Sequence, residues 1–101
     1  MSAESEASDV EPLWRELAGK LIREERTEQG RTLGQVSERA GISPQYLSEV
    51  ERGLKEPSSE MLASICGALG LRLADLLRAG DRELTRPWIR IAPSGPVLLA
   101  A

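Results

Sequence analysis

The sequence lacks histidine altogether and has one cysteine, Cys66, among its 101 residues. Without histidine, the chain has no side chain whose ordinary pKa lies near neutrality, and the commonest metal ligand is missing. A single cysteine cannot form an intramolecular disulfide, and an unpaired thiol fits a reducing compartment. There is also no phosphate-binding loop and no evident pair of catalytic acids. We therefore expect no metal, no cofactor and no enzymatic activity.

Long hydrophobic runs are missing as well. No apolar segment approaches the roughly 20 residues that a bilayer-spanning helix needs. Residues 1–12 are acidic and polar, whereas a signal peptide begins with basic residues and continues with an apolar stretch. These features predict a cytoplasmic protein without membrane contact.

The net charge of −3 is unevenly distributed along the chain. Residues 1–12 carry four acidic side chains and no basic one, so the rest has 13 basic and 12 acidic residues and a net charge of +1. Eleven of the 13 basic residues are arginine, which suits bidentate contacts with phosphate or carboxylate. Charge alone does not separate a nucleic-acid binder from a nearly neutral domain with an acidic tail.

Apolar spacing and capping residues predict five helices and no strand. The expected limits are Glu11-Pro12 to Gly30, Thr32 to Gly41, Ser43 to Gly53 with Pro44 in the first turn, Ser58 to Gly70, and a short fifth helix over about Leu73–Arg78. On its inner side, the fourth helix carries Cys66, for which a buried small hydrophobe is favoured over a redox sensor. Trp14, in the first helix, is expected in the core or at an interface.

The predicted helices form one all-α domain over residues 12–79, with flexible tails on both sides. Residues 1–11 are expected to be disordered, because they are acidic and lack periodicity. Residues 80–101 contain three prolines and no helical stripe, so we expect a C-terminal tail in which Trp88–Ile91 form at most a short extended segment.

Residues 32–52 contain two of these helices, joined by a tight turn at Gly41. The second helix is short and polar on its outer side, and Leu47 and Val50 hold its inner side. This is the arrangement of a helix-turn-helix motif, whose second helix enters the major groove of DNA.

The stretch "RTLGQVSERAGISPQYLSEVERGLKEPSSEMLASICGALGLRLADLL" resembles the Cro/C1 (xenobiotic-response-element) helix-turn-helix family, over roughly residues 18–78. Within it, "YLSEVERGLKEPSSEMLASIC" is similar to actinobacterial regulators of Clp protease genes, the ClgR/PopR type. The resemblance implies a lambda-repressor-like domain that regulates transcription, with activation of Clp genes as the expected outcome. Two departures stand out: Leu33 replaces a glutamine that often contacts a phosphate in this family, and Ser37 replaces the usual alanine.

Base contacts are expected from the first turns of the third helix. The Gln45 amide can pair with adenine through two hydrogen bonds. Pro44 either touches a thymine methyl group or only starts the helix. Glu49 either accepts a hydrogen bond from cytosine N4 or orients an arginine, and Ser48 is short and points outward.

Phosphate contacts are expected from the edges of the motif, where hydroxyl groups, basic side chains and free amides lie. The candidates are Arg31, Arg39, Ser43, Tyr46, Arg52 and Lys55. We expect Glu51 to tie the helix end to nearby amides or to an arginine instead of touching DNA.

A palindromic operator needs two copies of the domain, which predicts a homodimer. Contacts between copies are expected either from Trp88, Ile89 and Ile91 or from the apolar face at Leu73, Leu76 and Leu77. RNA polymerase is a further expected partner if the regulator activates transcription. The rival function is a protein-binding module of the same fold, such as an antitoxin or a coactivator.

The chain ends in Leu99, Ala100 and Ala101, which resemble the end of the tag that Clp unfoldases recognise on rescued proteins. An unfoldase engages an unstructured end first, so a mobile terminus suits this role. The narrower family resemblance supports it, since those regulators are Clp substrates. We therefore expect a degradation signal read by Clp protease, although an alanine-rich end can also arise by chance.

Overall fold

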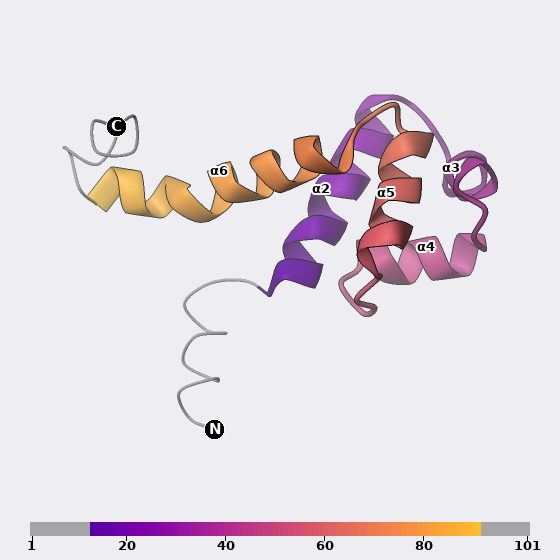
Figure 1. Cartoon of the computed structure of the whole chain (residues 1–101), viewed down its shortest axis with the longest axis horizontal. Helices are drawn as coiled ribbons and strands as arrows, with labels where there is room; N and C mark the ends of the chain where they lie inside the picture. Colours follow the sequence, from indigo (N-terminus) through magenta and orange to yellow (C-terminus); the bar gives the residue numbers. More distant parts are fainter. Residues whose placement is uncertain (1–12, 92–101) are drawn as a thin grey trace, which may run out of the picture.

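The structure is a computed structural model that describes residues 13–91, with side chains described for residues 13–85. Five α-helices follow one another, and no strand occurs in this part of the chain. Their bounds are α2 (Trp14–Glu28), α3 (Leu33–Ala40), α4 (Pro44–Glu51), α5 (Ser59–Ala68) and α6 (Leu73–Ile91). The predicted all-α architecture is confirmed (Figure 1). The tails predicted at residues 1–11 and the chain end at 92–101 lie outside the described residues.

Hydroxyl side chains begin three of the helices, at the residues that the sequence predicts. Thr32 Oγ1 accepts a hydrogen bond from the Gln35 amide at 3.0 Å, and Ser43 Oγ accepts one from the Tyr46 amide at 3.0 Å. Ser58 Oγ accepts a third from the Met61 amide at 3.1 Å. Each bond satisfies an amide that has no partner inside its helix, and such a cap typically contributes about 0.5–2 kcal/mol.

The core is built from one apolar stripe of each helix. Ile22 of α2, Val36 of α3, Leu47 and Val50 of α4 and Ile65 of α5 are all at most 1% exposed. Burial of a side chain of this size stabilises the fold by about 1.5–3 kcal/mol. The two short helices of the motif are therefore fixed by packing on α2 and α5, which leaves their outer faces free.

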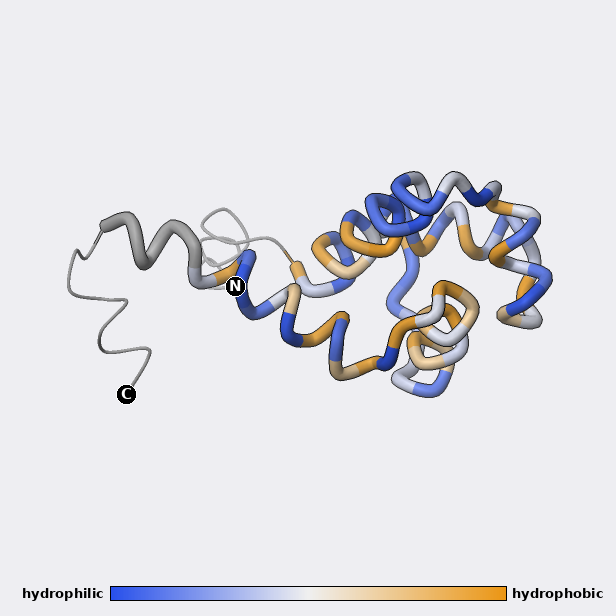
Figure 2. The backbone as a smooth tube through the Cα atoms, turned by 90° about the horizontal axis from the view of Figure 1, so that it is seen from above, coloured by the Kyte–Doolittle hydropathy of each residue, from blue (hydrophilic) through white to orange (hydrophobic). Residues whose placement is uncertain are grey.

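The predicted fifth helix begins at Leu73, as expected, but it is much longer than predicted. Helix α6 runs from Leu73 to Ile91, so the stretch Trp88–Ile91, expected to be extended, is helical. It lies beside α2 and then leaves the bundle (Figure 1). Hydrophobic and hydrophilic residues alternate along it as it leaves (Figure 2). None of the helices within residues 13–91 combines the length and apolarity needed to cross a bilayer.

Gly80, the first residue of the predicted C-terminal tail, lies inside α6. A glycine after an apolar stripe usually ends a helix, but Gly80 is buried inside α6. A Cβ atom at this position would lie 2.6 Å from Cζ3 of Trp14. Because glycine lacks this atom, the indole of Trp14 packs directly on the α6 backbone. Trp14 is thus part of the packing that holds α6 to α2.

Cys66 is buried in α5, as the sequence predicts, with 1% of its surface exposed. Burial, and then the charge of Asp75, raise the pKa of the thiol above its ordinary value. Since the thiolate is the reactive form, both the geometry and the electrostatics favour a packing role over a redox role.

Candidate nucleic-acid interface

Helices α3 and α4 are joined by the turn Gly41-Ile42-Ser43. Gly41 has a φ of 75°, a left-handed conformation that glycine adopts without steric cost. The Ile42 amide donates to the Ser37 carbonyl at 3.0 Å, which closes the end of α3. Ser37 is 1% exposed, and its hydroxyl donates to the Gly34 carbonyl at 3.1 Å, so the serine is accommodated with its hydrogen bond satisfied. The helix-turn-helix geometry predicted for residues 32–52 is confirmed.

Helix α4 buries one face and presents the other. Leu47, Val50 and Glu51 are buried on its inner side. Residues 44, 45, 48, 49 and 52 lie together on the opposite side, because positions four residues apart are neighbours on a helix surface. The structure therefore gathers the four predicted base-contact residues and Arg52 on one outer face.

The N-terminal half of that face is the more open. Pro44 and Gln45 are exposed, whereas Ser48 and Glu49 are half-buried. Pro44 has no amide hydrogen, the Tyr46 amide is bound by Ser43, and the Leu47 amide bonds to the Ser43 carbonyl at 3.1 Å. Only the Gln45 amide of this first turn is free for an external acceptor. Gln45 thus offers both its backbone amide and its side-chain amide at the tip of the motif.

The predicted phosphate-contact residues near α4 stand around this face. Ser43 is exposed, and its hydroxyl, which accepts from Tyr46, still has a hydrogen to donate. Tyr46 is half-buried and packs against the core. Arg52 and Lys55 are exposed, and their side chains make no hydrogen bond or ion pair with the described residues. Their positions suit phosphate contacts, which stay a prediction.

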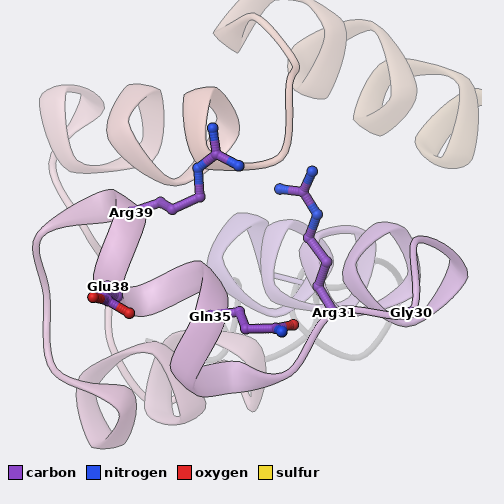
Figure 3. A pocket seen from close by; sticks show the side chains of 5 residues that line it. All are labelled: Gly30, Arg31, Gln35, Glu38 and Arg39. Carbon is purple, nitrogen blue, oxygen red and sulfur yellow. The ribbon is translucent and has the colours of Figure 1, made fainter.

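The other two candidates lie at the ends of α3: Arg31 precedes the helix and Arg39 lies in its last turn. They line an open pocket of about 480 Å³ with Gly30, Gln35 and Glu38 (Figure 3). Arg31 is half-buried, and its Nη1 donates to the carbonyl of Ala68, near the end of α5, at 2.6 Å. One N–H group of the Arg31 side chain is therefore used in a hydrogen bond within the domain and is not available to DNA. Arg39 is exposed, and its side chain has no hydrogen-bond or ion-pair partner within the described part.

An ion pair fixes the C-terminal end of α4 to α2. Glu51 Oε2 lies 2.7 Å from Arg26 Nε, and Glu51 Oε1 lies 3.0 Å from Arg26 Nη2, a bidentate arrangement. The two side chains are 4% and 12% exposed. The hydrogen bond with Glu51 raises the pKa of Arg26, against the opposing effect of burial. The expectation that Glu51 ties the helix end to an arginine is correct, and Arg26 is that arginine.

Two backbone contacts hold the same end of α4. Gly19 of α2 is so close that a Cβ atom there would lie 2.2 Å from the Val50 carbonyl oxygen and 2.7 Å from that of Glu51. Next to it, Arg15 Nε donates to the Gly53 carbonyl at 3.1 Å. Helix α4, the second or recognition helix of the motif, is therefore held from behind by close contacts with α2.

A second groove opens between α2 and α4. It has a volume of about 390 Å³ and is lined by Arg23, Arg26, Leu33, Ser48, Glu51 and Arg52. Arg23 is exposed, and its guanidinium group has no hydrogen-bond or ion-pair partner within the described residues. The sequence pattern does not single out Arg23, because it is one of many charges on the outer side of the first helix. Only the packing of α2 against α4 shows that it borders the motif.

A helix-turn-helix motif whose recognition helix is polar on its outer side is typical of DNA-binding transcriptional regulators. A helix-turn-helix family profile matches residues 22–76, and the chain belongs to this family, of the Cro/C1 (XRE) type. It is a regulator and not an enzyme.

Within that class the chain resembles ClgR. It is 49% identical over 85 residues to the transcriptional regulator ClgR of Mycobacterium tuberculosis strain H37Rv, covering 82% of this chain and 76% of the relative. The crystal structure of the clp gene regulator ClgR from Corynebacterium glutamicum superposes with a TM-score of 0.72 at 45% identity, covering 79% of this chain and 85% of that one. A complex of the SinR and SinI proteins contains a more distant neighbour, with a TM-score of 0.57 and 29% identity over 76% of each chain.

Proposed function

We propose that this chain binds an operator upstream of Clp protease genes, in the cytoplasm, and activates their transcription. The observation that carries the proposal is the outer face of α4, where Pro44, Gln45, Ser48 and Glu49 stand together on a helix held from behind. The similarity to ClgR, the clp gene regulator of Corynebacterium glutamicum, supports the choice of genes.

In the proposed complex, α4 lies in the major groove with its N-terminal end against the bases. The exposed Gln45 amide forms two hydrogen bonds with an adenine, which discriminates against other bases by about 1–3 kcal/mol. Pro44 offers an apolar ring beside it for a thymine methyl group. Ser48 and Glu49 follow one turn later, and the Glu49 carboxylate accepts from a cytosine. Its negative charge repels phosphates, so its contribution is to specificity and not to overall affinity.

Affinity in this proposal comes from phosphate contacts around the motif. Ser43, Arg52 and Lys55 flank α4, and Tyr46 lies in its first turn. Arg31 precedes α3, and Arg39 lies in its last turn. Each neutralised phosphate releases condensed counterions, so binding weakens as salt rises. Binding should therefore depend steeply on salt.

The proposed active species is a homodimer joined through α6. The sequence suggests the apolar residues at the start of α6 as one possible dimer contact. Among them, Leu76 is buried in the core, whereas Leu77 is 50% exposed. Leu84, seven residues further along the same helix, is 41% exposed. Residues seven apart lie on one side of a helix, so the two leucines form an apolar stripe that a second copy can cover. The alternative contacts at Trp88, Ile89 and Ile91 lie outside the described side chains.

We further propose that the regulator is itself removed by Clp protease through Leu99, Ala100 and Ala101. These residues lie outside the described part of the chain, and the proposal rests on their sequence. Activation would in addition require a contact with RNA polymerase. Together these steps form a feedback loop, in which the regulator raises the amount of protease and the protease shortens the regulator's lifetime.

A protein-binding role is the second candidate, because one structural neighbour was solved in a complex of two proteins, SinR and SinI. That role would not require the face of α4 to meet DNA. The discriminating experiment is DNase footprinting of the purified chain on fragments from upstream of clp genes, with mass from light scattering. The proposal expects protection of two half-sites about 34 Å apart by a dimer. No protection at low salt, together with a stable complex with another protein, would favour the second candidate.

A further inference from the structure

Arg23 is the basic residue beside the motif that the predicted contacts leave unexplained. It lines the groove between α2 and α4, on the opposite wall from Ser48 and Arg52. Its neighbours on α2 are committed to other partners: Arg26 binds Glu51, and Lys20 lies 4.0 Å from both Glu24 and Glu83. Arg23 alone among them is exposed without an acidic partner.

The charges that border this groove do not cancel. Arg26 and Glu51 form a tight bidentate pair, which is close to neutral when seen from outside. Of the uncharged lining residues, Leu33 contributes an apolar side chain and Ser48 a hydroxyl group. Two uncommitted guanidinium groups, those of Arg23 and Arg52, remain. A concave site with two free guanidinium groups attracts an oxyanion, and arginine binds carboxylate and phosphate groups in a bidentate way. Along a DNA duplex, the oxyanion present is the backbone phosphate.

The groove also lies where the DNA backbone would pass. Arg52 follows Pro44 by eight residues, which is about 12 Å along a helix at 1.5 Å per residue. The major groove of B-DNA is about 12 Å wide. If Pro44 and Gln45 lie against the bases, Arg52 at the other end of α4 therefore reaches the phosphates that border the DNA major groove.

We propose that Arg23 binds a backbone phosphodiester of the operator in the groove between α2 and α4, opposite Arg52. The inference rests on the proposed DNA binding and adds a ligand from the first described helix. The contact carries no base information, so it strengthens binding to every duplex alike.

The test compares Arg23→Ala with Lys20→Ala in the full chain. Both variants remove one positive charge from an exposed position of α2, but Lys20 does not line the groove. Affinity for operator and scrambled duplexes is measured by fluorescence anisotropy between 50 and 200 mM salt. Loss of one phosphate contact lowers the slope of log affinity against log salt by about 0.9, so the fourfold rise in salt should weaken Arg23→Ala about 3.5-fold less than wild type. Arg23→Lys, which keeps the charge, should keep the slope.

The outcomes separate this inference from the proposed function. Equal slope changes in Arg23→Ala and Lys20→Ala would overturn the role of Arg23 while leaving DNA binding intact. A wild-type chain that binds no duplex specifically would overturn the proposed function itself. Inorganic phosphate, added at constant ionic strength, distinguishes a free anion from the DNA backbone. If phosphate binds wild type but not Arg23→Ala while both chains show the same salt slope for DNA, the groove is a free-phosphate site and the inference is wrong.

Discussion

Gly19 is the position at which a single added methyl group should displace the recognition helix. A Cβ atom there would lie 2.2 Å from the Val50 carbonyl oxygen and 2.7 Å from that of Glu51, while real Cβ contacts essentially never fall below 3.0 Å. The gap between α2 and the end of α4 must therefore open by at least 0.8 Å, the difference between 2.2 and 3.0 Å. Both obstructing atoms belong to the backbone, so no side-chain rotation relieves the clash.

Two opposing terms decide the sign of Gly19→Ala. Alanine is favoured over glycine in a helix interior by about 1 kcal/mol. Overpacking typically costs about 1–3 kcal/mol, and a clash with backbone on a buried face belongs at the upper end of that range. We expect a net loss of about 1–2 kcal/mol, which lowers Tm by about 4–16 °C in a domain of this size. Affinity for the operator should fall as well, since the outer face of α4 moves with its backbone.

The matched control is Gly67→Ala, in α5. This glycine is also helical and has no atom within 4 Å of an added Cβ, so only the propensity term applies and Tm should rise. Thermal unfolding followed by circular dichroism measures both variants. If Gly19→Ala is as stable as Gly67→Ala, the close approach of α2 to α4 is not as we describe it.

Three further predictions concern the ion pair, the dimer and the chain end. Glu51→Ala leaves Arg26 buried without its acidic partner and should lower the free energy of unfolding by about 3–5 kcal/mol in denaturant titration. The control Glu56→Ala breaks only an exposed ion pair and should lower it by less than about 1 kcal/mol. Equal losses of stability would refute the role of Glu51 in holding α4 to α2. Leu84→Asp should halve the particle mass measured by light scattering, from dimer to monomer, without unfolding the domain. The control Ala74→Asp, at an exposed position in the first turn of α6, should leave the mass unchanged. If Leu84→Asp is still a dimer, the interface does not involve Leu84. Replacing Ala100 and Ala101 by aspartate should lengthen the half-life of the protein in cells several-fold, as an order of magnitude, and leave DNA binding unchanged. An unchanged half-life in cells with active Clp protease would show that these residues are not a degradation signal.

The helix-turn-helix motif is predictable from sequence because its signals are local. Thr32 and Ser43 each cap the helix that follows, and Gly41 takes the left-handed conformation that its place after an apolar stripe suggests. Cap, turn and apolar spacing act within a few residues of one another, so no knowledge of tertiary contacts is needed.

What the sequence does not predict depends on contacts between distant residues. Gly80 has the local pattern of a helix end, and only the indole of Trp14, 66 residues earlier, explains why α6 continues through it. Glu51 is predicted to find an amide or an arginine, but the choice of Arg26 depends on how α2 packs against α4. The same packing of α2 against α4 places Arg23 beside the motif, which the sequence pattern alone does not show. Side chains on outer faces therefore have to be placed by the fold before their roles can be argued.

The central claim is that the outer face of α4 reads bases, with Gln45 as its leading residue. The most direct measurement is the affinity of wild type and Gln45→Ala for a set of operators in which each base pair is replaced in turn. We predict that Gln45→Ala loses about 1–3 kcal/mol of preference at one base pair in each half-site and keeps its affinity for non-operator DNA. If Gln45→Ala discriminates at every base pair as sharply as wild type, Gln45 is a solvated surface residue and this account of the interface is wrong.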